Sequence, residues 1–308
     1  MIIRERPTLG QLFFIYRGSV IQRIFPQMLV VVAMSAIIVI AHRLAPQFVP
    51  SVAGAPFTLI GIALSIFLSF RNSACYERWW EARKNWGELL AASRDLARQT
   101  ELFEARSAEA AQARRLILLL TVVLADELVK FLRGGDCPNN SAVRLLPKEM
   151  SDAIKASRHP PVHIVDLIGR QLIELQRNGM LSDVEFSLFD RTMTRLSGSL
   201  AACERLRTTP VPFGYTLLIH RTAHMFCFMV PFGFADVLGP ATPLAAGLVA
   251  YTFFGLDALG DELEEPFGTL PNDLPIAAIS TVIEIDLRSM LGDTDLPPMP
   301  KPVDHILL

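Results

Sequence analysis

Charged residues are scarce for a chain of this length. Of 308 residues, 19% are Asp, Glu, Lys or Arg, whereas a soluble globular domain carries about 25%. The apolar share is 51% and the mean hydropathy is +0.35, so the chain is neither disordered nor typical of a soluble enzyme. A membrane location is therefore the first possibility to test.

Two further features are missing. Charge of one sign is not in excess, because 29 basic residues face 31 acidic ones and the formal net charge is −2. A general nucleic-acid-binding protein carries a strong basic excess, so no nucleic-acid partner is expected. The sequence also has no C-x-x-C pair to suggest zinc or redox chemistry. The scattered cysteines predict packed free thiols rather than a disulfide framework; they are Cys75, Cys137, Cys203 and Cys227.

Apolar runs near membrane-spanning length occur four times. The first, residues 24–41, is close to the ~20 residues that a spanning helix needs. A cleaved signal peptide is the alternative, but the charged stretch before this run is long for one, and a second run follows quickly. That second run, residues 57–70, begins after Pro56, and good helix formers continue the helix beyond the membrane. The last two runs cover residues 213–234 and 238–259.

The region between the second and third runs predicts a helical domain outside the membrane. Residues 108–133 have an apolar middle, but Asp126, Glu127 and Lys130 interrupt it. A core helix is therefore a better interpretation than another span. Residues 134–161 are rich in Gly, Pro and Asn and are predicted to be loop-like.

Apolar periodicity predicts two more helices in this region. They cover residues 163–178 and 182–206, with Gly179 between them. Ser182 and Glu185 have the spacing of a capping box at the start of the second helix. The sequence shows no internal repeat and no low-complexity tract.

The distribution of basic residues predicts the orientation. Arginines are concentrated before the first run and after the second, whereas the loops at 42–55 and 235–240 carry few. Both termini and the middle domain are therefore expected in the cytoplasm, with an extended proline-rich tail after Asp293. The predicted segments are a cytosolic N-terminal segment (1–23), the first and second transmembrane helices (24–70), a helical cytosolic domain (71–210), the third and fourth transmembrane helices (211–260) and a cytosolic C-terminal segment (261–308).

One face of the second run is the best candidate for a pore. Ile62, Ile66 and Phe70 lie at i, i+4 and i+8, so they share one face of a helix. Small residues such as Gly61 and Ser65 lie between them and permit close helix approach. A bulky apolar row can gate an ion path as a hydrophobic constriction. From spacing alone, a lipid-facing or core row is the more ordinary interpretation.

Two motifs carry a resemblance to a known family. An R-W-W tripeptide follows Phe70 on the same predicted helix, and a D-E-L-E-E-P-F-G element closes the fourth run. Together they resemble the bestrophin family of ion channels, over most of the chain from about Ile3 to Asp286. The motif residues are Arg78, Trp79, Trp80, Pro266, Phe267 and Gly268.

The resemblance implies an all-α membrane protein that assembles as a homopentamer, with four transmembrane helices per subunit and a large helical cytosolic region. Five copies of the second helix would line a central neck at Ile62, Ile66 and Phe70. Met180, beside the helix break at Gly179, is the candidate for the narrow cytosolic aperture. The resemblance implies no cofactor; the expected partners are other copies of the chain, membrane lipid and permeant ions.

One departure from the family concerns calcium and the choice of ion. Eukaryotic members follow P-F-G with an acidic calcium clasp, but residues 269–273 here hold the single carboxylate of Asp273. Calcium prefers six to eight oxygen ligands, so calcium activation of that kind is not expected. The short chain resembles the bacterial branch, which implies the inner membrane and favours small monovalent cations such as sodium. An anion (chloride) channel is the alternative.

Acidic residues are dense at the end of the fourth run. They are interpreted as a solvated helix end or as partners for arginines near Arg71, with attraction of cations as the sharper alternative. Arg71 itself is expected to snorkel to the membrane boundary. The acidic residues are Asp257, Asp261, Glu262, Glu264 and Glu265.

A membrane-embedded metalloenzyme is the hypothesis from another class. His220 and His224 have the i, i+4 spacing of two metal ligands on one helix face, near the acidic group. The sequence has no H-E-x-x-H motif, and the charge of Arg221 between the histidines would disfavour a cation. Polar packing near the membrane interface is the preferred interpretation, so neither a metal nor enzymatic activity is expected.

Overall fold

The computed structural model describes residues 1–4, 8, 10, 15–16, 18–45, 47, 54–135 and 140–308. Arg6 and Arg17, which counted toward the predicted orientation, and Cys137 lie outside the described residues. Within the described part of the chain, regular structure is helical, and β pairing is limited to isolated bridges near the termini. The helices are α2 (Ile21–Leu44), α3 (Gly54–Thr100), η1 (Glu101–Phe103), α4 (Ala108–Leu132), α5 (Ser141–Leu145), α6 (Lys148–Ala156), α7 (Pro160–Arg177), α8 (Asp183–Thr208), α9 (Phe213–Leu238), η2 (Gly239–Ala241), α10 (Thr242–Glu264) and α11 (Ile276–Met290).

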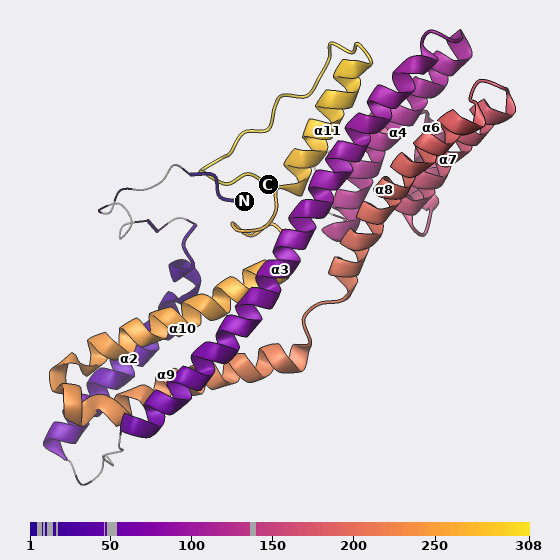
Figure 1. Ribbon diagram of the computed structural model, residues 1–308. Helices are drawn as coiled ribbons and strands as arrows, with labels where there is room; N and C mark the ends of the chain where they lie inside the picture. The colour runs from indigo at the N-terminus through magenta and orange to yellow at the C-terminus, as the bar shows by residue number, and fades with distance from the viewer. Residues whose placement is uncertain are drawn as a thin grey trace. The chain divides into compact units, whose positions relative to one another are not determined.

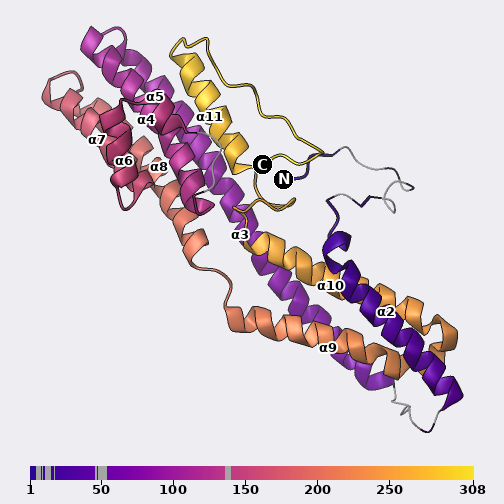
Figure 2. The same ribbon diagram turned by 180° about the vertical axis from the view of Figure 1, so that it is seen from behind.

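The chain divides into two compact units, described separately below (Figures 1 and 2). The span unit comprises residues 4–79 and 210–266, and the terminal unit comprises residues 1–3, 80–209 and 267–308. Helix α3 contributes its first half to the span unit and its second half to the terminal unit.

Three helical stretches are long and apolar enough to cross a membrane: Ile21–Leu44, Gly54–Phe103 and Phe213–Glu264. The last stretch contains α9 and α10, which η2 joins and which pack against each other. The predicted apolar runs therefore all lie in helices. Helix α2 extends the first run at both ends. Helix α3 starts two residues before Pro56 and continues to Thr100, as the helix formers after the second run predicted.

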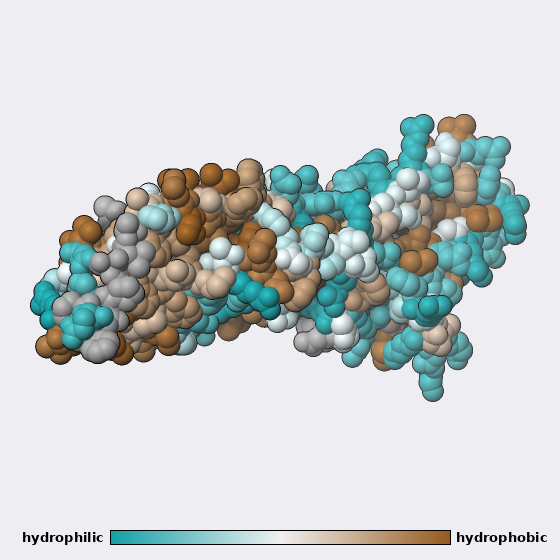
Figure 3. All heavy atoms as spheres, turned by 90° about the horizontal axis from the view of Figure 1, so that it is seen from below, coloured by the Kyte–Doolittle hydropathy of each residue, from teal (hydrophilic) through white to brown (hydrophobic). Residues whose placement is uncertain are grey.

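The span unit has a small core and an apolar surface. Helix α2 lies beside α10, and α9 packs on both (Figures 1 and 2). Their shared core includes Ile24, Phe57 and Phe226. Many large apolar side chains remain exposed on these helices, and Figure 3 shows apolar residues gathered over the surface of this unit. Apolar exposure of this extent is typical of a surface that another protein or a membrane covers.

A glycine in α9 lets the start of α3 approach closely. A Cβ atom at Gly233 would lie 2.5 Å from Cδ2 and 2.7 Å from Cε2 of Phe57. Phe57 is buried in the span unit's core. Glycine at this position is therefore required for the packing of α3 on α9.

Helix α4 is the central element of the terminal unit, as the interpretation of residues 108–133 as a core helix predicted. Its side chains from Ile117 to Val129 are all buried, and α7 and α11 pack on it. The charges that argued against a span have partners inside this unit. Asp126 accepts hydrogen bonds from Ser280 Oγ at 2.5 Å and from the Ser141 amide at 3.3 Å.

The prediction of a loop over residues 134–161 is wrong for much of that range. Helices α5 and α6 occupy residues 141–145 and 148–156. The prolines mark helix starts rather than loop: Pro147 is the N-cap residue of α6, and Pro160 begins α7. A proline lacks an amide hydrogen, and the first helical turn leaves that group unbonded anyway.

Other local predictions are confirmed. Gly179 separates α7 from α8 with φ +71°, and Ser182 and Glu185 form both bonds of the capping box. Beyond Asp293 the tail has no helix and returns to the N-terminus, where the Ile3 amide donates to His305 O at 2.8 Å. The other described cysteines are free and buried: Cys75, Cys203 and Cys227.

Candidate pore helix and ion-pair site

The candidate neck residues lie on the exposed side of α3. The side of α3 that packs in the span unit carries Leu64 and Leu68, which are buried. Ile62, Ile66 and Phe70 are 55%, 50% and 64% exposed. Two residues of helix turn by ~200°, which places Leu64 almost opposite Ile62. The row is therefore not part of the chain's own core, so its interpretation as a core row is excluded and the lipid-facing and pore-lining interpretations are left.

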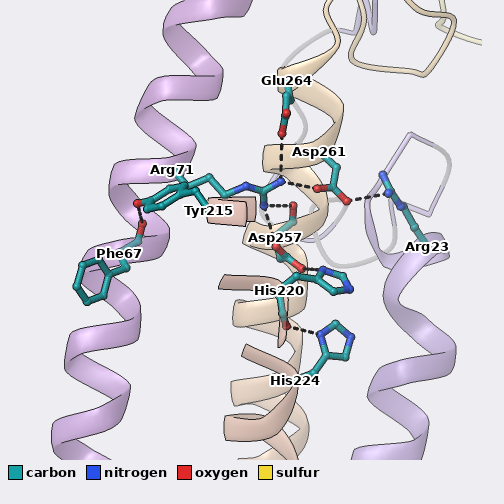
Figure 4. A network of polar contacts seen from close by, with 9 residues as sticks. All are labelled: Arg23, Phe67, Arg71, Tyr215, His220, His224, Asp257, Asp261 and Glu264. Atoms are coloured by element: carbon teal, nitrogen blue, oxygen red, sulfur yellow. Dashed lines mark hydrogen bonds and ion pairs between the residues drawn. The ribbon is translucent and has the colours of Figure 1, made fainter. Parts of the chain in front are cut away.

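Arg71 follows this row and is the centre of a buried ion-pair network (Figure 4). Its Nη1 donates to Asp257 Oδ1 at 2.8 Å and to Asp257 O at 3.2 Å. Its Nη2 lies 2.5 Å from Asp261 Oδ1 and 3.5 Å from Glu264 Oε2. The three acids are spaced by four and three residues, so one face of α10 presents them together to α3.

The network corrects the expectation for Arg71 and decides between the two interpretations of the acidic residues. The Arg71 side chain is 0% exposed, so it does not snorkel to a boundary. Burial of a guanidinium requires paired, hydrogen-bonded carboxylates, and the acids of α10 supply them. Asp257, Asp261 and Glu264 are therefore arginine partners rather than merely a solvated helix end.

The two motifs that carry the family resemblance contact each other beside this network. Arg78 Nε donates to Glu264 O at 3.2 Å, next to the P-F-G element. The R-W-W residue Trp79 stacks on Tyr76 at 6.1 Å between ring centroids. Arg78 therefore binds a backbone carbonyl at the end of α10, where helix carbonyls lack intrahelical partners.

In the terminal unit, the remaining motif residues have structural contacts. The Trp80 ring lies 5.4 Å from the Arg83 guanidinium carbon, a cation–π contact. Phe267 is buried, and its carbonyl accepts a hydrogen bond from Arg133 Nε at 3.3 Å. These contacts indicate packing roles.

The histidines of α9 are packed on the same network. His220 Nδ1 lies 2.6 Å from Asp257 Oδ2, and His224 Nδ1 lies 2.8 Å from His220 O (Figure 4). The two rings are 4.4 Å apart at their centroids, and His224 also packs on Phe254. The sequence placed the histidines near the acidic group, but the pairing of His220 with Asp257 depends on how α9 and α10 pack and was missed.

Met180 lies in the turn between α7 and α8. Its carbonyl accepts a hydrogen bond from the Arg106 guanidinium, and its sulfur lies 3.8 Å from Ser107 Oγ at the start of α4. The turn is therefore fixed to α4. The assignment of Met180 to an aperture stays a prediction.

Comparison with known proteins identifies the family. A family model described as "Bacterial/Fungal Bestrophin protein" matches residues 1–289. The chain belongs to the bacterial and fungal bestrophins. A solved bacterial bestrophin homologue from Klebsiella pneumoniae is 40% identical, covers 89% of this chain and 100% of its own, and superposes with a TM-score of 0.83. The resemblance drawn from the two motifs is confirmed.

Relatives of similar length are named as channels. A protein of Mesorhizobium japonicum is 40% identical over 304 residues, 99% of this chain and 96% of the relative. One of Escherichia coli is 36% identical over 308 residues, 100% of both chains. Both are named voltage-dependent anion channel-forming proteins. The bestrophin is thus an ion-channel protein of a membrane and not an enzyme, and the names give no support to the expected preference for sodium.

Proposed function

We propose that this bestrophin forms a homopentameric channel in the bacterial inner membrane and passes small monovalent ions without energy input. Each subunit crosses the membrane four times, through α2, the first part of α3, α9 and α10. The boundaries are those predicted from the sequence, with 71–210 as the cytosolic domain and both termini in the cytoplasm. Membrane lipid covers the outward apolar surfaces.

The position of the Ile62, Ile66 and Phe70 row on α3 carries this proposal. A channel of several subunits needs a helix face that its own subunit leaves uncovered. The row is that kind of face, because it is exposed and lies opposite the buried side of α3. Five copies around an axis would form an apolar, uncharged neck that gates by excluding water. Met180 would form a second constriction in the cytosolic domain.

The permeant ion is either an anion or a cation, and a different observation favours each. Anions are favoured by the names of the relatives. Cations are the second candidate, because acidic residues are dense at the end of α10: Asp257, Asp261, Glu262, Glu264 and Glu265. An uncharged neck selects neither sign by itself. Charge in the approaches to the neck would then set the preference.

Recording from purified pentamers in planar bilayers under asymmetric NaCl tests the proposal. Current is expected above empty-bilayer controls, and the reversal potential gives the sign of the permeant ion. Correctly assembled pentamers without current would refute the channel. A reversal potential on the sodium side would refute the anion assignment and support the cation one.

A pair of isoleucine variants tests the neck itself. Ile66→Ala should widen the neck and raise single-channel conductance. Ile60→Ala is the matched control, because Ile60 is also exposed on α3 but lies ~120° around the helix from Ile66. Equal conductance in the two variants, with normal assembly, would remove Ile66 from the neck.

A further inference from the structure

Two imidazoles and one buried carboxylate converge between α9 and α10 of the span unit. His220, His224 and Asp257 each offer a ligand atom, and these atoms lie within 4.8 Å of one another. Figure 4 shows the two rings one above the other along α9, tilted to each other, with Asp257 beside the His220 ring. We propose that His220, His224 and Asp257 bind one divalent transition-metal ion of the zinc class in each subunit.

The chemistry of the three groups favours zinc over the alkaline-earth cations. Imidazole nitrogen and carboxylate oxygen are zinc ligands at about 2.0–2.2 Å, whereas Mg²⁺ and Ca²⁺ prefer oxygen alone. Ligand atoms around a tetrahedral ion with such bonds are ~3.4 Å apart. Side-chain rotations complete the site by closing separations of up to 4.8 Å and by opening the 2.6 Å between His220 Nδ1 and Asp257 Oδ2 to this value. Water fills the remaining position.

The surrounding contacts already orient two of the ligands. His224 Nδ1 lies 2.8 Å from His220 O; a carbonyl only accepts, so this nitrogen carries the proton and Nε2 is left to bind the ion. Asp257 Oδ1 accepts from Arg71 Nη1 at 2.8 Å, and its Oδ2 faces His220. Hydrogen bonds on the non-ligating atom are the usual support of metal ligands in proteins.

Neighbouring positive charge does not exclude a cation here. Arg71 contacts Asp261 and Glu264 in addition to Asp257, so carboxylates outnumber the guanidinium. Arg221 is exposed and lies ~100° around α9 from His220. The sequence argument that Arg221 lies between the ligands therefore does not hold in three dimensions. The His220 side chain is half exposed, which leaves the ion a route to the site.

A metal ion at this position would join two helices. His220 and His224 belong to α9 and Asp257 to α10, and Asp257 also holds Arg71 of α3. Because the ion binds only the folded arrangement, it would stabilise the span unit by an amount that grows with the logarithm of its concentration above the dissociation constant. This site is independent of ion conduction, and its test requires no current.

The experiment uses the full-length pentamer in detergent, freed of its affinity tag and stripped of metal. Zinc chloride is added, with magnesium chloride as the comparison, and bound metal per subunit and the thermal midpoint are measured. One zinc ion per subunit and a midpoint that rises with zinc but not with magnesium are expected. His224→Gln and His220→Gln should each weaken zinc binding at least about tenfold.

His42→Gln is the matched control. His42 is also a histidine of the span unit in contact with a carboxylate, that of Asp236, but it has no second histidine beside it within the described residues. This variant should bind zinc as the unchanged protein does. Zinc binding that survives both His220→Gln and His224→Gln, or that is lost equally in His42→Gln, would overturn the proposal.

A fourth variant separates loss of the ligand from loss of the fold. His224→Cys keeps a zinc ligand at this position, because thiolate sulfur also binds zinc. It should retain zinc-dependent stabilisation that His224→Gln loses, while both remain pentameric by size-exclusion chromatography. Equal loss in the two variants would show that the imidazole acts only in packing.

Discussion

The close approach of α3 to α9 allows a stability prediction for one methyl group. In Gly233→Ala the new Cβ atom would lie 2.5 Å from the Phe57 ring, whereas ordinary contact begins at 3.4 Å. The ring must therefore move by about 0.9 Å, the difference between these distances. Phe57 is buried against the core of the span unit, so the movement disturbs further neighbours.

Overpacking of this kind costs about 1–3 kcal/mol. Replacing a helical glycine also brings a gain of about 0.5–1 kcal/mol, because alanine loses less backbone entropy on folding. Gly87→Ala measures that gain alone, since Gly87 lies on the same helix as Phe57 and a Cβ there meets nothing within 4 Å. Gly233→Ala should therefore be less stable than Gly87→Ala by about 1–3 kcal/mol.

Thermal unfolding of the purified protein measures the difference. At ~2–4 °C per kcal/mol for a chain of this size, the midpoint of Gly233→Ala should lie ~2–12 °C below that of Gly87→Ala. Phe57→Leu should make Gly233→Ala less harmful than it is in the unchanged background, because the smaller side chain leaves room for the methyl group. Equal midpoints for the two alanine variants would refute the close contact of α3 with α9.

Three further predictions concern single polar groups. Burial raises the pKa of the Asp126 carboxyl despite its hydrogen bonds. The folded protein therefore takes up this proton at a higher pH than the unfolded chain, and stability should rise as the pH falls through the raised pKa toward the ordinary 3.8. Asp126→Asn should flatten this part of the curve of unfolding midpoint against pH. Ser182→Ala should cost about 1 kcal/mol in denaturant unfolding by removing the N-cap of α8, and an unchanged midpoint would exclude the cap. Arg71→Met should cost about 3–5 kcal/mol by leaving Asp257 buried without its guanidinium, measured as a lower midpoint of unfolding. Arg78→Met, which removes a hydrogen bond to the Glu264 carbonyl, is the milder comparison.

Local signals explain which elements the sequence predicts well. Helix α2 follows from an uncharged apolar run, and the start of α8 follows from Ser182 and Glu185 three residues later. Gly179 marks a helix break because it adopts φ +71°, which other residues rarely tolerate. In each case the determinant lies within a few residues of the element itself.

Elements whose determinants are distant in sequence were missed. Helix α11 buries Glu284 and Arg288 together with its apolar residues, so its inward face does not have an apolar pattern. Arg144 of α5 supplies the partner for Glu284, at 2.7 Å, and that pairing is not visible in either segment alone. The exposed, snorkelling side chain expected for Arg71 was wrong for the same reason, because its partners are about 190 residues away.

The position of Arg71 connects the ion-pair network to the proposed neck. Apolar helix faces pack in several axial registers at similar cost, whereas a buried arginine is satisfied only where its carboxylates lie. A slip of α3 by one turn, ~5.4 Å, would carry Arg71 away from Asp257 and Asp261. Phe70 precedes Arg71 directly, so the contact that fixes Arg71 toward α10 also fixes the rotation of Phe70, and with it Ile66 and Ile62, toward the uncovered side of α3. A variant that keeps the fold but weakens this ion pair should therefore alter the rotation of Ile62, Ile66 and Phe70 more than the packing of the buried side chains.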